Sequence, residues 1–350
     1  MVDIESVEAQ LNAERRKVDV ATHNFSVREL TRMMSDEELN VAPEYQRKFR
    51  WTEAGESAFI ESVFLGLPIP PIFVATNVGF QWEVVDGLQR LSTLMHFMAE
   101  CPEDLAIINR IAPLRLTGLE KLSELNGKLA DDLPKSLRVY FGRQPLQVVS
   151  LTDKSDLQVR FDVFERLNKG AVALTAQEVR ACVYRGDFNA FLEELSGNAD
   201  LAALLRLQDV KKHDGTKAEQ VLKFFAYRER RAAFDGRVEH FLNTYMEDAT
   251  QAFEYEKSRR EFAESTAKLR ELCSGGPFLR SDYGVTPLVQ FEGCLVAVAD
   301  LLNDKVPIVQ PAGKWLDDIE LKRASMGGSN TRAALARRID RAKALLSGTA

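Results

Sequence analysis

The spacing of apolar residues changes near residue 190, and this change most limits what the chain can fold into. Up to about residue 190, short apolar runs that end at turn residues alternate with stretches of helical spacing. Beyond that point almost nothing has the alternation of a strand, and helical periodicity covers residues 216–234, 239–273, 286–302 and 331–346. Helices that each bury one apolar stripe pack on one another. We therefore expect an α+β protein, with a mixed domain over residues 1–195 and an all-helical domain over residues 196–350.

The composition is that of an ordinary folded protein. With 350 residues, 45% of them apolar and 28% charged, the chain is long enough to bury a substantial core. Its formal net charge of −6 argues against a surface that coats nucleic acid, so any contact with DNA is expected to be local. The four cysteines, at positions 101, 182, 273 and 294, have no CxxC spacing, which indicates reduced thiols and neither a zinc site nor a disulfide framework.

Two segments bear on where the protein resides. The first 20 residues are acidic and mixed, and they lack the apolar stretch of a secretory signal. The longest apolar segment, residues 285–302, contains Gln290, Glu292 and Asp300, which predicts a buried helix and not a membrane span. We expect a soluble protein of the cytoplasm.

Local patterns predict several elements of the first half. Thr175 with Glu178 three residues later predicts the capping box of a helix. An apolar stripe at residues 59, 60, 63, 64 and 67 predicts a helix that stops at Gly66 and Pro68. The other expected elements are strands in residues 68–76 and 78–86, two strands around residues 142–143, and a helix over residues 155–167.

The stretch EVVDGLQRLSTLMHFM, residues 83–98, carries the most informative motif. A short apolar strand runs directly into Asp86 and Gly87, after which apolar residues recur at helical spacing. The N–H groups that begin such a helix point at one small volume, where the helix dipole favours an anion. Gly87 would allow close backbone approach, and Arg90 could grip phosphate oxygens in a bidentate manner. Asp86 would then hold a magnesium ion. The alternative is structural, with Asp86 as a helix cap and Arg90 on a solvated face.

Two further stretches carry side chains that suit phosphate chemistry. Residues 43–51, PEYQRKFRW, combine cationic heads with aromatic faces, a composition suited to stacking a base or binding a phosphate. The alternative is a loop whose aromatic residues enter the core. Glu165 and Asn168, near the end of a predicted helix, are oxygen donors of the kind that magnesium accepts, although the same residues also fit an ordinary helix end.

Together these stretches resemble a known family. PEYQRKFRW, ESVFLGLPIPPIFV, DGLQRLSTL, FERLNKGAVALTAQEVRACVYRG and FLNTYM occur in the order found in the N-terminal domain family of GmrSD-type restriction endonucleases, a branch of the ParB/sulfiredoxin-like superfamily. The resemblance covers roughly residues 25–250. It implies a ParB-like mixed α/β domain that binds and often hydrolyses nucleotides in bacterial systems restricting phage DNA. Members usually have Gln where this chain has Leu88, which bears on hydrolysis more than on phosphate binding.

The resemblance also assigns expected roles to individual residues. It places phosphate binding on Gly87, Gln89, Arg90, Tyr45, Gln46, Arg47 and Asn168, and magnesium or manganese on Asp86 and Glu165. The implied mechanism is metal-assisted attack of water on a terminal phosphoryl group, in which Arg47 and Arg90 neutralise developing charge and Asp86 or Glu165 holds the metal. No residue stands out as an obligatory base.

Histidines and arginines elsewhere refine this interpretation. The four histidines are widely spaced, so an HNH nuclease is not expected within the chain, and His96 is expected in the core. Several arginine runs occur in the helical half, where the simplest interpretation is a solvated helix face. Among them, residues 325–343 best suit a nucleic-acid backbone, because a Ser/Asn/Thr helix start precedes a row of arginines.

Three hypotheses follow. The leading one is an NTP-dependent defence protein that senses DNA or gates a nuclease. The second is a non-catalytic regulatory module that binds a nucleotide or DNA, and the third is a ParB-like DNase, which the lack of a dense acidic cluster disfavours. The partners considered are a nucleoside triphosphate, DNA including modified or phage DNA, a separate nuclease chain and further copies of the same chain, with no membrane.

Overall fold

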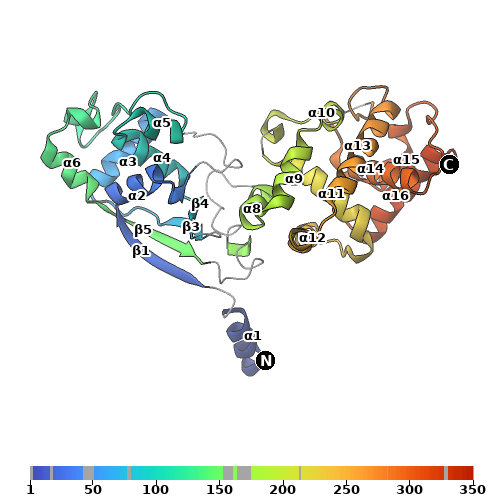
Figure 1. The fold of residues 1–350 in the computed structure, drawn as a ribbon, viewed down its shortest axis with the longest axis horizontal. Coiled ribbons are helices and arrows are strands. Elements are labelled where there is room, and N and C mark those ends of the chain that lie inside the picture. The colour runs from blue at the N-terminus through green and yellow to red at the C-terminus, as the bar shows by residue number, and fades with distance from the viewer. Residues whose placement is uncertain are drawn as a thin grey trace. The chain divides into compact units, whose positions relative to one another are not determined.

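The protein consists of two compact units. The computed structural model describes residues 3–15, 19–41, 51–76, 80–152, 161–163, 175–212, 214–281, 283–326 and 330–349. Close contacts divide the chain into Met1–Leu174 and Thr175–Ala350 (Figure 1). The sequence had suggested a boundary at residue 195, whereas packing assigns the two helices before that point to the second unit.

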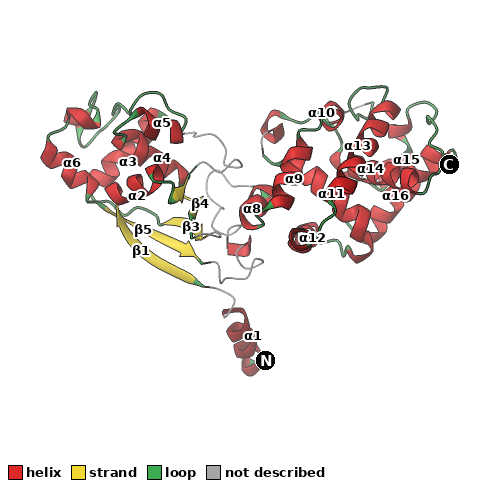
Figure 2. Ribbon diagram, viewed as in Figure 1, coloured by secondary structure: helices red, strands yellow, loops and turns green. Residues whose placement is uncertain are grey.

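The first unit contains a mixed five-stranded sheet. Its strands are β1 (Val20–Ser26), β2 (Leu39–Asn40), β3 (Ile72–Thr76), β4 (Trp82–Asp86) and β5 (Pro145–Leu151), in the order β1-β5-β3-β4-β2. The β1–β5 and β3–β4 pairs are antiparallel, and the β3–β5 and β2–β4 pairs are parallel. The helices of this unit are α1 (Ile4–Arg15), α2 (Val27–Ser35), α3 (Glu53–Phe64), α4 (Leu88–Met98), α5 (Pro102–Ile107) and α6 (Lys135–Gly142). Figure 2 shows α2 to α6 gathered on one side of the sheet, so the predicted α+β class is confirmed.

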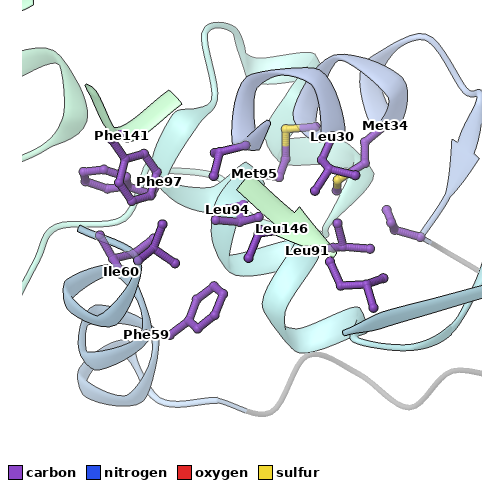
Figure 3. Packing of buried hydrophobic residues seen from close by; sticks show 14 of the residues in the cluster. Leu30, Met34, Phe59, Ile60, Leu91, Leu94, Met95, Phe97, Phe141 and Leu146 are labelled. Atoms are coloured by element: carbon purple, nitrogen blue, oxygen red, sulfur yellow. The ribbon is translucent and has the colours of Figure 1, made fainter. Parts of the chain in front are cut away.

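The core of this unit lies between that face of the sheet and the helices. From α4, Leu91, Leu94 and Met95 are at most 1% exposed, and they pack with residues of α2 and α3 (Figure 3). Helix α2 begins where the Ser26 side chain accepts a hydrogen bond from the Glu29 N–H, an N-cap that stops β1 and starts the helix. The core therefore holds α4 in place, and with it the motif at residues 86–90, where β4 ends and α4 begins.

Two local predictions for this unit were wrong, and one strand was missed. Residues 135–142 form a helix where a strand was expected, because Phe141 is fully buried and packs between aromatic rings of α3 and α4. Strand β1 was not predicted, since its sequence, VATHNFS, has little alternation of apolar and polar residues. Leu67 lies beyond α3 and is 51% exposed. Most of the helix expected at residues 155–167 lies outside the described residues.

The second unit is helical throughout its described elements. Its helices are α8 (Ala176–Val183), α9 (Asp187–Ser196), α10 (Ala199–Leu204), α11 (Thr216–Arg230), α12 (Val238–Gln251), α13 (Tyr255–Leu272), α14 (Leu288–Asn303), α15 (Ile319–Arg323) and α16 (Arg332–Ser347). Helix α8 starts at the predicted capping box, in which Thr175 and Glu178 bond to each other's backbone N–H groups. Helix α14 is buried over most of its length, as predicted. None of the described helices combines the length and apolar character needed to cross a bilayer.

A chain of buried charges crosses the second unit. The Arg180 guanidinium lies 2.7 Å from a Glu219 oxygen, and Lys223 Nζ lies 3.0 Å from Glu219 and 3.4 Å from Glu292. Arg338 ends the chain, 3.9 Å from the other oxygen of Glu292. Burial raises the pKa of Glu292, against the opposing effect of Lys223 and Arg338. The four helices α8, α11, α14 and α16 are therefore joined by alternating charges.

Candidate functional site

The motif at residues 86–90 forms the turn between β4 and α4. Asp86 ends the strand, and Gly87 adopts φ 108° as the N-cap of the helix. A Cβ added to Gly87 would lie 3.0 Å from Ile72 Cγ1 of β3. The glycine is therefore required by the backbone conformation and by its close approach to the neighbouring strand. Its predicted role in approach to a ligand is not needed to explain its presence.

A β-bulge brings a second carboxylate to the side of Asp86. Ala75 pairs with Glu83 and Phe73 pairs with Asp86, with the register shifted between them by one residue of β4. Since directly paired residues point to the same face, and Phe73 and Ala75 share a face, Glu83 and Asp86 also share it. Glu83 is 1% exposed, whereas the Asp86 side chain is 43% exposed. Sequence reasoning missed Glu83, although an acid inside the run WEVVD is a detectable signal.

Arg90 is held in place by three acceptors. One terminal nitrogen donates to the Pro70 carbonyl and, at 3.1 Å, to the Pro71 carbonyl, while the other donates to Asp86 Oδ2 at 2.6 Å. The side chain is only 12% exposed. A guanidinium has five N–H donors, so Nε–H and one terminal N–H have no partner among the described residues. Arg90 is thus an oriented, partly satisfied cation, and the expected solvated side chain is not observed.

Gln89 joins the turn to the end of the PEYQRKFRW stretch. Its side-chain oxygen accepts a hydrogen bond of 3.1 Å from the Trp51 backbone N–H. The Trp51 ring packs on Phe59 of α3 at a centroid distance of 5.6 Å. Two motifs that lie 35 residues apart in sequence therefore meet at the start of α4. Leu88 is half-buried against the core.

Five of the predicted site residues lie outside the described part of the chain. These are Tyr45, Gln46, Arg47, Glu165 and Asn168. Within the described residues, no group of three or more His, Cys, Asp or Glu side chains is arranged to hold a metal ion. The described part of the candidate site therefore consists of Asp86, Gly87, Gln89 and Arg90, with Glu83 added.

His96, on the same helix, has a structural role, as predicted. It is 3% exposed, with Nδ1 2.5 Å from Glu56 Oε2 and Nε2 2.9 Å from the Ala112 carbonyl oxygen. Arg110 donates to the other oxygen of Glu56 at 3.0 Å. Both ring nitrogens are thus engaged in holding α3, α4 and the loop after α5 together.

Most arginines of the best basic segment are engaged within the protein. On α16, Arg338 is 1% exposed, Arg341 pairs with Asp318 at 2.7 Å, and Arg332 donates to the Phe234 carbonyl. Lys343 pairs with Asp300 at 3.4 Å. The row of arginines on α16 that was predicted to contact DNA therefore has few cations left for a phosphate backbone. Arg338, Arg341 and Lys343 pair with acids of α14 and of the segment before α15.

These features define a class of protein before they define a family. The first unit is an α+β domain in which the internal strand β4 ends in Asp-Gly at the start of a helix, and an arginine one turn later is fixed by that aspartate. Residues 30–185 match the model of the GmrSD restriction endonuclease N-terminal domain, and this part of the chain belongs to that family. The match contains four of the five stretches that suggested the family and ends before residues 241–246. Searches of curated proteins and of solved structures gave no significant match.

Proposed function

We propose that this protein is the nucleotide-binding, NTP-hydrolysing component of a bacterial restriction system that senses DNA or gates a nuclease. The family match supports the restriction role. One observation supports nucleotide binding most directly: Asp86 fixes Arg90 beside the first turn of α4, while Gln89 anchors the stretch that contains Arg47. A cytoplasmic location, where nucleotides and phage DNA meet, is part of the same proposal.

Backbone N–H groups and arginine side chains at the turn would bind different oxygens of a polyphosphate. The first-turn N–H groups of α4 lack intrahelical acceptors by the geometry of any α-helix, and they suit phosphate oxygens. Arg90 would add the two N–H donors that its structural contacts leave over. Arg47, with Tyr45, Gln46 and Asn168, would supply the further phosphate ligands.

The carboxylates suit a magnesium or manganese ion that accompanies the nucleotide. Magnesium takes oxygen ligands and is often held by one or two carboxylates together with substrate phosphates. Glu83 and Asp86 offer such a pair on one face of the sheet, and Glu165 would add a third oxygen donor. When bound, the metal would neutralise phosphate charge and orient water. Arg90 and Arg47 would stabilise charge on the terminal phosphoryl group as water attacks.

The central experiment is magnesium-dependent release of phosphate from each of the four NTPs, with and without DNA. Asp86→Asn keeps the size of the side chain and an acceptor for Arg90 but removes the charge. We expect it to lower turnover about 100-fold, the usual effect of removing one electrostatic contact to a transition state. Asp131→Asn, at an 87% exposed carboxylate of the same unit, is the matched control and should keep full activity. Absence of both nucleotide binding and turnover in the unmodified protein would refute the proposal.

Binding of a nucleotide without turnover would select the regulatory-module hypothesis. Leu88 favours this alternative, because its half-buried side chain takes the position where relatives usually carry a polar amide. Nicking of plasmid DNA by the purified protein, lost in Asp86→Asn, would instead select the DNase hypothesis.

A further inference from the structure

We propose that β1 pairs with β1 of a second copy of this chain, in an antiparallel arrangement with its two-fold axis at His23. Strand β1 is the first strand in the sheet order and pairs only with β5. Figure 1 shows it as the outermost long strand of the sheet. It spans seven residues without a register shift, so one continuous backbone edge is presented to a partner.

The hydrogen bonds at the two ends of β1 show which residues face outward. The Thr152 N–H donates to the Asp19 carbonyl at 3.1 Å, and the Val27 N–H donates to the Gln144 carbonyl at 3.0 Å. Because bonded pairs alternate along an antiparallel ladder, the odd-numbered residues of β1 bond to β5. Val20, Thr22, Asn24 and Ser26 therefore direct their N–H and C=O groups away from the sheet. The N–H and C=O groups of Val20, Thr22 and Asn24 have no hydrogen-bond partner among the described residues, whereas the Ser26 carbonyl belongs to the first turn of α2.

The strand lacks the features that usually block pairing at a sheet edge. Native edges are protected by charged side chains, proline, bulges or a covering element. The sequence VATHNFS contains no lysine, arginine, acid or proline, and no described element is hydrogen-bonded along its outer edge. Thr22 and Asn24 are exposed on the outer face. An open edge of this kind favours another strand as its occupant.

The sequence of β1 is complementary to itself about His23. With the axis at His23, Thr22 lies opposite the second copy's Asn24, and Val20 lies opposite the second copy's Ser26. These are the outward-facing residues, so this register pairs the N–H and C=O groups of Thr22 with those of Asn24 in the second copy and brings Val20 opposite the end of the partner's β1. Ala21 lies opposite the second copy's Phe25, and no charged residue opposes another. Directly opposed side chains that can hydrogen-bond, here Thr22 and Asn24 of the second copy, stabilise a sheet.

The expected dimer is weak. A contact between two strands of this length buries less than the roughly 1,200 Å² at which standard interfaces begin, a size typical of weak, transient association. Helix α1, just before β1, leaves Ile4, Val7 and Leu11 exposed at helical spacing, by 69, 47 and 52%. Together with Val20, which is 44% exposed in β1 itself, these side chains form uncovered apolar surface near the strand, and burying them would strengthen the association.

Sedimentation velocity of the full chain, from about 1 to about 200 µM, tests the pairing through charge swaps. Thr22→Asp with Asn24→Asp opposes like charges across the axis and should weaken the dimer at least tenfold. Thr22→Lys with Asn24→Asp opposes unlike charges and should restore it. Ser136→Asp with Ala267→Asp adds the same two charges at exposed positions elsewhere and should have no effect.

Amide exchange provides a second measurement that needs no substitution. The Thr22 and Asn24 amides should exchange more slowly as protein concentration rises, while the Ala21 and His23 amides, bonded to β5, should not change. The proposal is overturned if the unmodified chain stays monomeric over the whole range. It is equally overturned if the double aspartate variant dimerises as tightly as the unmodified chain, or if exchange at Thr22 and Asn24 does not depend on concentration.

Discussion

At the scale of single residues, both the fold and the candidate site require a residue without a side chain at Gly87. Its φ of 108° disfavours any side chain, and Ile72 stands 3.0 Å from where a Cβ would lie. Both facts concern the backbone of the turn that presents the α4 N-terminus. A substitution here therefore changes the position of Asp86 and Arg90 as well as the stability of the domain.

We expect Gly87→Ala to destabilise the protein by about 2 kcal/mol, from backbone strain and crowding together. Gly127→Ala is a matched control, because Gly127 has φ 78° but no atom of the described residues within 4 Å of an added Cβ. It should cost about 1 kcal/mol from strain alone. Urea unfolding compares the two variants, and equal costs would mean that Ile72 moves aside freely.

The side chain of Arg90 illustrates how far sequence could predict the site. The motif correctly indicated a strand, a turn and a helix with an arginine one turn in. It could not indicate that the Pro70 and Pro71 carbonyls come within reach of the guanidinium, since that depends on a loop 20 residues away. The same limit hid Glu83, because a bulge changes which face a strand residue occupies.

At the scale of elements, the contact between Gln89 and Trp51 joins α4 to the segment before α3. The Trp51 N–H donates to the Gln89 side chain, and the Trp51 ring packs on Phe59. One hydrogen bond thus fixes where the arginine-containing stretch rejoins the domain.

Gln89→Leu removes the acceptor for the Trp51 N–H while keeping the side chain close in size. We expect faster exchange of the Trp51 amide and a loss of stability of about 1 kcal/mol. Gln144→Leu serves as the control, because the Gln144 side chain donates only to the exposed end of α6, at 3.3 Å. Unchanged exchange at Trp51 would show that packing on Phe59 suffices to hold the segment.

A second pair of elements, the loop before α14 and the turn before α15, is joined by Asp317. Lys322 and Ser281 both bond to its carboxylate and lower its pKa to about 2. Because the folded pKa lies below the ordinary value of about 3.9, the contact stabilises the fold above pH 4. That contribution is lost as pH falls from about 4 to about 2.

Asp317→Asn should therefore reduce the dependence of stability on pH in this window. Urea unfolding at about pH 5 and about pH 3 should show a smaller difference for the variant than for the unmodified chain. Ser281→Ala, which removes one donor, should give an intermediate difference. Identical differences in all three proteins would contradict the assignment to Asp317.

At the scale of the whole molecule, the chain of charges from Arg180 to Arg338 shows that helical periodicity in the sequence does not determine which charged side chains are buried. Arginine-rich helices suggested solvated faces, yet Arg180 and Arg338 are each 1% exposed. Helical spacing identifies the two sides of a helix, but it does not tell whether a charged side finds a partner of opposite charge inside the unit. The approximate limits of α11, α14 and α16 could be predicted, whereas the break between α12 and α13 and the electrostatic connections of the helices could not.

Lys223 is the central cation of this chain, since it contacts both Glu219 and Glu292. Lys223→Met should cost about 3–5 kcal/mol, because it removes the nearer cation from the buried Glu292 and leaves only Arg338, 3.9 Å away. Lys257→Met breaks the exposed pair with Glu254, in which both side chains are 74% exposed, and should cost less than about 1 kcal/mol. Thermal unfolding distinguishes the two, and similar small losses would show that solvent reaches Glu292.

The position of α8 has a practical consequence for anyone who wishes to excise the restriction-family domain. The family match ends at residue 185, which keeps α8 but discards the segments on which it rests: the Asp214 carbonyl that accepts from Thr175, and Glu219 on α11. A fragment cut there would expose Arg180 without its counter-charge, together with the apolar side of α8. Fragments that end at residue 174 leave α8 out altogether, and those that continue through α16 keep these contacts intact.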